Sequence, residues 1–388
     1  MSPTIVLILA LGIGLLLLEL YHLLKPSSPL ELSAISYELS ESNCALEIIS
    51  WFEIKNLNDT IEIMVPELKV NPVLMGSMDF NDIIIETKTI AHHPDQTSRP
   101  DNYWKAYIVK GKKKTQVEIR VLIKDLKENY KTRYFENLWL DIHWTNYGPF
   151  GRLNRREGFN IALNRPQRVN SESISFHENN GYSVLPIKTH LLGVFDNPIE
   201  VLSYYSENLL KPRDILTIGE TPLAIMQGRY KHPEGIKPGL LALIMCRAFH
   251  PTSSLATACG FQSLIDLVGP SRVIIAWFLG VVTKLIGLRG GFYVFAGEQA
   301  RLIDDITGTT PPYDQTIVLG PISSEVFCEE AASILGVDVA IVDVNDLGRV
   351  KVIAASENCN RLLLKKALKP NPAGNADQKT PIVLVRPC

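Results

Sequence analysis

Residues 214–229 read DILTIGETPLAIMQGR, and this stretch decides how the second half of the chain is interpreted. It begins with an apolar run that is typical of a buried strand and continues into a turn of small residues. The stretch ends at Gly228-Arg229. Glycine lets the backbone approach a ligand closely, and arginine adds a permanent positive charge. We therefore expect Gly228 and Arg229 to contact an anion such as a phosphate.

Two later blocks carry oxygen-bearing side chains. RLIDDITGTTPPYDQTIVLGP contains the adjacent acids Asp304 and Asp305, and VAIVDVNDLGRVKV presents Asn345 and Asp346 after a strand-like run. Ligand-binding side chains collect at strand ends in sheets that are covered by helices. Carboxylate and amide oxygens at such ends suit a hard divalent cation.

In order and local spacing, these three blocks resemble the gamma-glutamyl ligase family that elongates coenzyme F(420). The resemblance extends from about Tyr182 to the mid-350s and leaves the first 181 residues outside. That family uses GTP and a divalent metal to add glutamate to a deazaflavin precursor. The resemblance therefore implies a mixed α/β domain over residues 182–388 and, if the site is active, a GTP-dependent acid–amino acid ligase.

The resemblance also assigns roles to particular residues. It implies backbone contacts to the nucleotide from Leu185, Pro186 and Ile187, in the LPI element. It implies phosphate contacts from Gly228 and Arg229. Whether the nucleotide is GTP or ATP does not follow from these residues.

For the metal, Mg or Mn, the resemblance implies oxygen ligands from the second and third blocks. The ligands are Asp304, Asp305, Asn345 and Asp346, and the catalytic acids among them are Asp304 and Asp346. Each of these residues is also a common cap or turn residue, which is the structural alternative for it.

The chain departs from the family pattern at several positions. Thr221 and Ile225 stand where the family has lysines that approach the phosphates, and the acid of the last motif has moved one place, to Asp346. Lys188 and Lys231 lie near the matched blocks and are candidate replacements. The departures keep a second hypothesis open, in which the chain is a catalytically degenerate scaffold or binding protein.

Composition excludes little. The length of 388 residues favours two domains. The formal net charge of −2 gives no basic footprint for nucleic acid. Its six cysteines show no metal-ligand spacing, which favours free thiols in a reducing compartment.

The N-terminus predicts a membrane anchor over residues 1–29. Residues 4–18, TIVLILALGIGLLLL, carry no charge, and no positive n-region precedes them. Lys25 follows the apolar stretch and favours a single-pass protein whose soluble part is cytoplasmic.

Residues 30–168 alternate apolar and polar side chains in short runs, which predicts an antiparallel β-sandwich. Trp51, Trp104, Trp139 and Trp144 lie in these runs, and we expect them to fill the sandwich core. A polar stretch over residues 169–181 is typical of a linker.

Residues 273–287, VIIAWFLGVVTKLIG, resemble a second membrane span. The uncharged core between Arg272 and Lys284 covers only eleven residues, which is too short to cross a bilayer. We expect a buried or surface-associated helix, and a re-entrant membrane contact is the alternative.

These observations give an α+β protein with an anchor, a β-sandwich and a ligase-like domain. The first functional hypothesis is a membrane-anchored, nucleotide- and metal-dependent enzyme that adds glutamate to a carboxylated small molecule. The degenerate scaffold is the second, and a lipid-facing or carrier role for the sandwich is the third. Expected partners are a nucleotide, a small-molecule acid and the membrane, without nucleic acid; a homodimer is one assembly under consideration.

Overall fold

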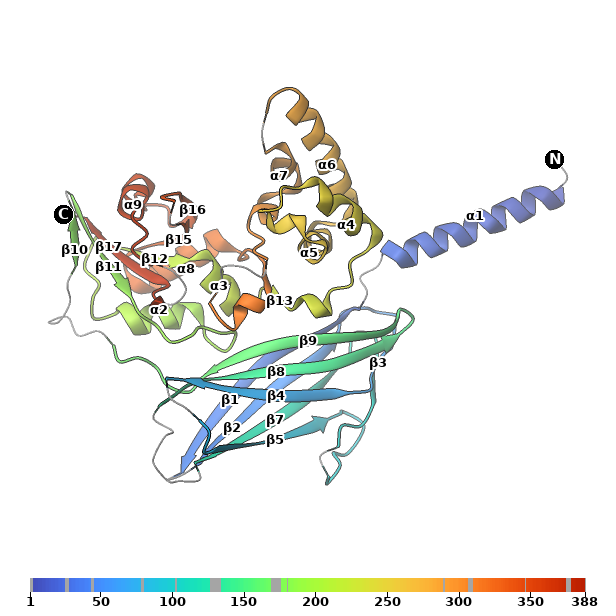
Figure 1. Ribbon diagram of the computed structural model, residues 1–388, viewed down its shortest axis with the longest axis horizontal. Helices are drawn as coiled ribbons and strands as arrows, with labels where there is room; N and C mark the ends of the chain where they lie inside the picture. Colours follow the sequence, from blue (N-terminus) through green and yellow to red (C-terminus); the bar gives the residue numbers. More distant parts are fainter. Residues whose placement is uncertain are drawn as a thin grey trace.

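The computed structural model is an α+β protein, as the sequence predicted, and nearly all of its described strand pairs are antiparallel. Figure 1 shows a β-sandwich below, a mixed sheet with helices and a helical subdomain above it, and helix α1 projecting to one side. The structure describes residues 3–24, 28–42, 45–77, 80–101, 103–125, 134–168, 176–179, 181–288, 290–305, 310–345, 347–374 and 378–387.

The first domain is a sandwich of two antiparallel sheets, ordered β1-β2-β7-β5 and β4-β8-β3-β6, with β9 paired to β8. Alternation of apolar residues produces it: every second residue of β2 is buried. The strands are β1 (Leu30–Ser42), β2 (Ala45–Asn56), β3 (Ile63–Val65), β4 (Leu68–Gly76), β5 (Ile83–His92), β6 (Tyr107–Val109), β7 (Lys114–Asp125), β8 (Phe135–Gly148) and β9 (Gly151–Ala162).

The tryptophans divide between two environments. Trp104 and Trp144 are buried in the sandwich core, as expected. Trp139 instead packs against the second domain, and Trp51 is half-buried beside His92. The expectation of a common core is therefore wrong for Trp139 and Trp51, because strand alternation places residues on both faces of a sheet and does not say which face is covered by another domain.

The second domain is built on a six-stranded sheet of order β10-β11-β17-β12-β15-β16. β12 and β15 are parallel, and the other neighbouring strands are antiparallel. The carboxyl ends of β11, β12 and β15 therefore lie at one edge of the sheet. The strands are β10 (His177–Asn179), β11 (Tyr182–Ile187), β12 (Ile215–Gly219), β15 (Asp338–Val344), β16 (Val350–Ala355) and β17 (Ile382–Pro387).

Helices cover both faces of this sheet. Leu216 and Ile218 face the side of α2 and α8, and Ile215 faces the side of α9. The four helices are α2 (Pro198–Ser206), α3 (Glu220–Met226), α8 (Ser324–Leu335) and α9 (Arg361–Ala367). The sequence predicted α2, α8 and α9, but it treated the residues after β12 as a turn, and they form α3. Pro222 lies in the first turn of α3, where a missing N–H costs no hydrogen bond.

A helical subdomain is inserted between β13 (Tyr230–Lys231) and β14 (Ile317–Val318), which pair with each other. Gly269, with φ of 86°, and Pro270 end α5 and start α6, so the two helices meet at a sharp bend. The elements are η3 (Pro233–Gly235), α4 (Leu240–Met245), η4 (Cys246–Ala248), η5 (Ser254–Ala256), α5 (Ala258–Val268), α6 (Pro270–Leu285), α7 (Gly291–Ala296), η6 (Glu298–Arg301) and η7 (Tyr313–Gln315).

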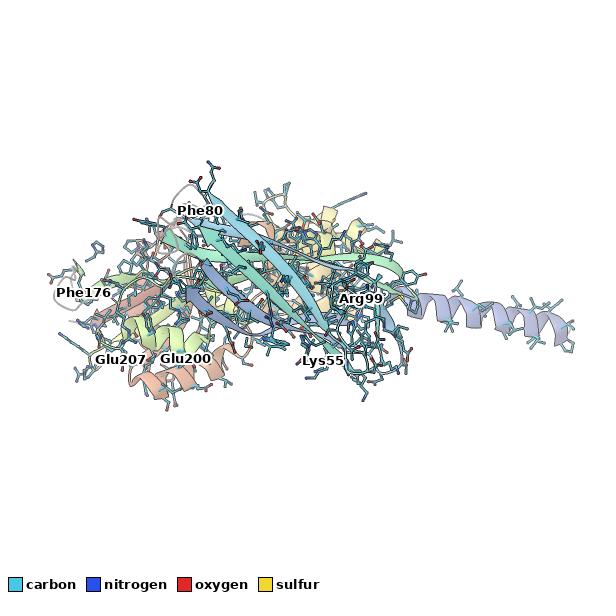
Figure 2. The ribbon with its side chains drawn as sticks, turned by 90° about the horizontal axis from the view of Figure 1, so that it is seen from below. Lys55, Phe80, Arg99, Phe176, Glu200 and Glu207 are labelled. Atoms are coloured by element: carbon cyan, nitrogen blue, oxygen red, sulfur yellow. The ribbon has the colours of Figure 1, made fainter. Side chains whose placement is uncertain are left out.

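Helix α1 (Pro3–Leu24) is apolar along its described side chains, which project from both sides of the helix, clear of the rest of the molecule (Figure 2). Across the described ranges, no single helix combines the length and the hydropathy that a membrane crossing needs; α5 and α6 meet the criterion only as a pair bent by 112°. Lys25, used above for orientation, and most of the predicted linker, residues 169–175 and 180, lie outside the described residues.

Candidate functional site

A cavity of about 230 Å³ opens at the sheet edge where β11, β12 and β15 end. Its walls come from four segments of the chain: residues 189–192 after β11, residues 217–225 across the end of β12, residues 342–344 of β15, and residues 371–374 and 379–383 before and in β17. Thr310 and Tyr313 add to the lining. The cavity therefore lies where side chains at strand ends converge.

Carboxylates from different segments meet at this cavity. Glu220 begins α3 directly after β12, and Asp343 lies near the end of β15; both line the cavity. β12 and β15 are parallel neighbours, so their ends place these two acids at the same edge. Asp304 pairs through its backbone with Val318 and lies within electrostatic range of both.

The three acids have unequal surroundings. Burial and then the charges of Asp343 and Asp304 together raise the pKa of Glu220 to about 8, against a lowering by Lys351. Burial and then Asp343 raise the pKa of Asp304 to about 6, while a hydrogen bond from Thr221 lowers it. The Asp304 side chain is exposed, whereas Glu220 is buried. Glu220 is therefore mostly protonated at neutral pH.

The wall after β11 is held by a buried histidine. His190 Nε2 lies 2.9 Å from Asp196 Oδ1, and His190 Nδ1 lies 2.7 Å from the Tyr205 hydroxyl. Burial raises the pKa of Tyr205 to about 12, so its hydroxyl stays protonated. Asp196 also accepts from the Gly193 amide, at 2.9 Å. This network fixes the position of the histidine ring in the cavity wall.

The β-sandwich supports the same wall. Asn160 on β9 donates to the Leu191 carbonyl, at 2.6 Å, and Trp139 on β8 packs in one cluster with Leu191, Ile225 and Tyr313. Leu191, Ile225 and Tyr313 all line the cavity. The first domain therefore backs the cavity directly and is more than a separate module.

The LPI element, which was predicted to contact the nucleotide, lies in strand β11. Leu185, Pro186 and Ile187 pair with β17, and Leu185 and Ile187 are buried in the domain core. They do not line the cavity, whereas the residues two to five places later, Thr189 and its followers, do. Their role in nucleotide binding stays a prediction.

Arg229 is held by Gly320 and Gln299 and is outside the cavity lining. Its Nε donates to the Gly320 carbonyl at 3.2 Å, and its NH2 group to Gln299 Oε1 at 3.3 Å. Gly228 has a φ of 68°, which explains the glycine by backbone conformation. Neither residue lines the cavity, so their phosphate contacts also stay predictions.

The predicted metal ligands are not all brought together. Asn345 Oδ1 accepts from the Arg349 amide at 3.0 Å and so caps the turn after β15. Asp305 follows Asp304, but its charge acts on Cys259. Burial raises the pKa of the Cys259 thiol most, and the charge of Asp305 is the second cause. Asp346 lies outside the described residues.

Two cavity acids were missed. Glu220 lies inside the first quoted stretch and in the first turn of α3. An acid at this position commonly stabilises the helix through its dipole, so its presence alone does not indicate a binding site. Asp343 was taken as part of a buried strand. The sequence signal was an acid near the end of each of two apolar runs, and only the structure shows that these runs pair in parallel.

The donor chemistry of the cavity fits a hard cation. Glu220 and Asp343 offer carboxylate oxygens, which Mg²⁺ and Mn²⁺ prefer. Within the described part of the chain, no three His, Cys, Asp or Glu side chains form a group that could hold a metal ion. A Mg²⁺ site of the usual kind takes one or two carboxylates and completes its shell with water and substrate phosphate, so two acids are enough.

Comparison with known proteins identifies the first domain. Residues 31–165 match the family model of the F(420)-0:gamma-glutamyl ligase, N-terminal Ig-like domain. The resemblance to this ligase family is thus confirmed, but in the domain that the sequence motifs left outside it. Comparison with curated proteins finds no match.

Two solved structures are distantly similar to this chain. The GAE domain of GGA2p from Saccharomyces cerevisiae is 12% identical, covers 34% of this chain and 100% of its own, and has a TM-score of 0.20. The ASH/PapD-like domain of human CEP192 is 12% identical, covers 36% of this chain and 87% of its own, and has a TM-score of 0.18. At such TM-scores neither carries an argument about this chain.

Proposed function

We propose that the chain is a membrane-anchored, nucleotide- and metal-dependent ligase that joins the amino group of glutamate, or a related amine, to a carboxylated small molecule. One observation carries the proposal: Glu220 and Asp343, from the ends of two parallel strands, face one cavity that is backed by an Ig-like domain of the gamma-glutamyl ligase type. If active, the enzyme would be a gamma-glutamyl ligase that uses GTP or ATP as the nucleotide.

Glu220 and Asp343 would hold the cation, with Asp304 beside them. A bound Mg²⁺ or Mn²⁺ would neutralise phosphate charge during activation of the acceptor acid. Without a cation, three acids within electrostatic range repel one another, and Glu220 keeps a proton instead. The cavity is therefore arranged for a positive charge.

Lys379 is the basic side chain at the cavity that is placed to attract an anion. It lines the cavity and also pairs with Glu136 of β8, at 2.8 Å between Nζ and Oε2. Thr217 and Thr221 add hydroxyl groups to the same lining. These residues would orient the phosphate or carboxylate of the substrate.

Binding of nucleotide to the full-length protein in detergent tests the proposal. GTP or ATP with Mn²⁺ should raise the melting temperature, because a ligand at a hundredfold excess over its Kd stabilises the folded state by about 2.7 kcal/mol. Asp343→Asn should abolish the shift. Glu325→Gln, at an exposed acid on α8, should leave it unchanged. A shift that survives Asp343→Asn would place the nucleotide elsewhere and refute the proposal.

The second candidate is a degenerate ligase fold that acts as a scaffold. The observation in its favour is that Ile225, at a position where the family has lysine, is 5% exposed and packs with Trp139 and Tyr313. Arg229 is likewise engaged away from the cavity. No shift at millimolar nucleotide and Mn²⁺ would favour this function.

The anchor and the location are also proposed. Helix α1 exposes apolar side chains along its described length, which supports a single-pass anchor, and Lys25 downstream of it favours a cytoplasmic soluble part. Resistance of the protein to alkaline carbonate extraction, with protease sensitivity of the sandwich from the cytoplasmic side only, would agree. Digestion of the sandwich by protease added outside intact cells would reverse the orientation.

A further inference from the structure

The helical subdomain presents a large apolar surface to the outside. In α6, only Val273 and Ala276 are buried. Exposed large apolar side chains lie on α4, on α6 and α7, and on the turn between α6 and α7. We call this set the apolar face: Leu240, Leu243, Ile244, Ile274, Ile275, Trp277, Phe278, Val281, Val282, Leu285, Ile286, Leu288, Val294 and Phe295.

The face is not needed to complete the core beneath it. Phe261, Phe292 and Leu264 fill that core together with Val273 and Ala276. Exposed apolar patches of this extent on a folded domain mark a surface that meets another apolar phase.

Charge decides which phase that is. From residue 234 to residue 298 the sequence holds five Lys and Arg residues and three acids, of which Glu234 and Glu298 stand at the two ends of the range and only Asp266 lies between them. Lys237, Arg247, Arg272 and Lys284 are all exposed. A face of aliphatic and aromatic side chains with basic residues around it is complementary to an anionic lipid surface. Two copies packed through the same face would bring like charges together.

The position of α1 agrees with a lipid surface. Ser28, four residues after α1, accepts a hydrogen bond from Asn146 of β8, at 2.7 Å. Arg156 of β9 pairs with Glu234 of η3, which leads into α4. In the β8–β9 ladder Arg156 pairs with His143. His143 precedes Asn146 by three residues on β8, so the two contacts lie about 10 Å apart along the strand. Figure 1 shows α1 projecting from this end, beside the helical subdomain.

We propose that the apolar face of α4, α6 and α7 lies in the interfacial layer of an anionic lipid bilayer, as a second membrane contact besides α1. The bend of 112° between α5 and α6 keeps α6 from continuing across the bilayer and sets it as a surface-lying helix. Arg272 and Lys284, at the two ends of the uncharged run, would reach the headgroups. The cavity would then face the water layer next to the membrane.

Fluorescence of Trp277 tests this in the full-length protein, because the other tryptophans all lie in the sandwich. The protein is reconstituted in vesicles of phosphatidylcholine and phosphatidylglycerol, with and without brominated acyl chains. The difference between wild type and Trp277→Phe isolates the emission of Trp277. Quenching of that emission by brominated lipid is the expected result, and it should weaken in pure phosphatidylcholine.

Two variants sharpen the test. The double variant Phe278→Ser/Leu285→Ser should at least halve the quenching of Trp277, whereas Leu362→Ser, on exposed α9, should leave it unchanged. Trp277 that is open to aqueous acrylamide but not to brominated lipid would show a solvent-exposed face. Trp277 that is shielded from both quenchers would show a protein contact. Either outcome overturns the proposal, and neither bears on nucleotide binding.

Discussion

The indole of Trp139 on β8 meets the ring of Tyr313 edge to face, with centroids 5.1 Å apart and an interplanar angle of 88°. Trp139 belongs to the Ig-like domain, and Tyr313 lines the cavity of the second domain. A Cβ atom on Gly158 would lie 1.8 Å from the Trp139 ring, so the neighbouring strand needs glycine there. The contact explains why an Ig-like domain accompanies this cavity: it supplies part of the wall's support.

Trp139→Ala should therefore weaken both stability and binding. Removal of a buried indole costs about 3 kcal/mol of unfolding free energy, through lost contacts and the space left behind. The wall at Tyr313 should also loosen and raise the Kd for nucleotide. Thermal melts and nucleotide titration of the full-length protein measure the two effects. Trp51→Ala, at a half-buried tryptophan away from the cavity, is the control and should leave the Kd unchanged. Equal effects of the two variants on binding would contradict the support role.

The ion pair of Lys379 and Glu136 gives a second prediction. Both side chains are partly exposed, at 33% and 41%, so the pair should contribute less than about 1 kcal/mol to stability. A double-mutant cycle with Lys379→Met and Glu136→Gln measures this coupling. Lys379→Met should raise the Kd for nucleotide much more than Glu136→Gln does, because only Lys379 lines the cavity. Similar Kd values for the two variants would show that Lys379 serves the domain contact alone.

The raised pKa of Glu220, about 8 against an ordinary 4.5, predicts a pH dependence of stability. Between these values the folded protein keeps a proton that the unfolded chain releases, so the unfolding free energy falls as pH rises from about 4.5 to 8. The fall is at most about 1.4 kcal/mol per pH unit for one proton. Glu220→Gln cannot ionise and should show a smaller fall between pH 5 and pH 8.

Urea unfolding at several pH values, without added metal, measures this slope. Glu325→Gln removes an exposed acid on α8 and should keep the slope of the wild type. A wild-type slope in Glu220→Gln would show that the Glu220 carboxyl is not protonated in the folded state near neutral pH.

Local sequence patterns predicted much of the fold because they act at short range. Alternation along residues 45–56 predicted a half-buried strand, and β2 is buried at every second residue. The apolar runs DILTI and VAIVDV became β12 and β15. What such patterns lack is the partner of each face. Trp139 looks like a core residue along β8, and only the packing of the second domain shows that it lies between domains.

The site was harder to predict than the fold because motif similarity and side-chain direction are separate properties. Arg229 ends a stretch that resembles the family, yet its guanidinium binds the Gly320 carbonyl and Gln299. Asn345 follows the expected strand, yet its amide oxygen caps a turn. Glu220 and Asp343 lie inside the matched blocks without an assigned role, and parallel strands bring them to one edge. Long-range pairing, which spacing along the chain does not encode, decides the difference.

Thr221→Lys tests whether the cavity wall still follows the path of a nucleotide. Thr221 stands where the ligase family that this chain resembles has a phosphate-binding lysine; it lines the cavity and is half-buried, so a lysine there would extend from the cavity wall. The new ammonium would lie near Asp304, the present partner of the Thr221 hydroxyl, and would lower the pKa of that carboxyl. We expect about tenfold tighter nucleotide binding, equivalent to about 1.4 kcal/mol. Isothermal titration with and without Mn²⁺ measures it. Thr221→Met has similar length without charge and should not tighten binding; if both variants bind equally, the phosphates do not pass along this wall.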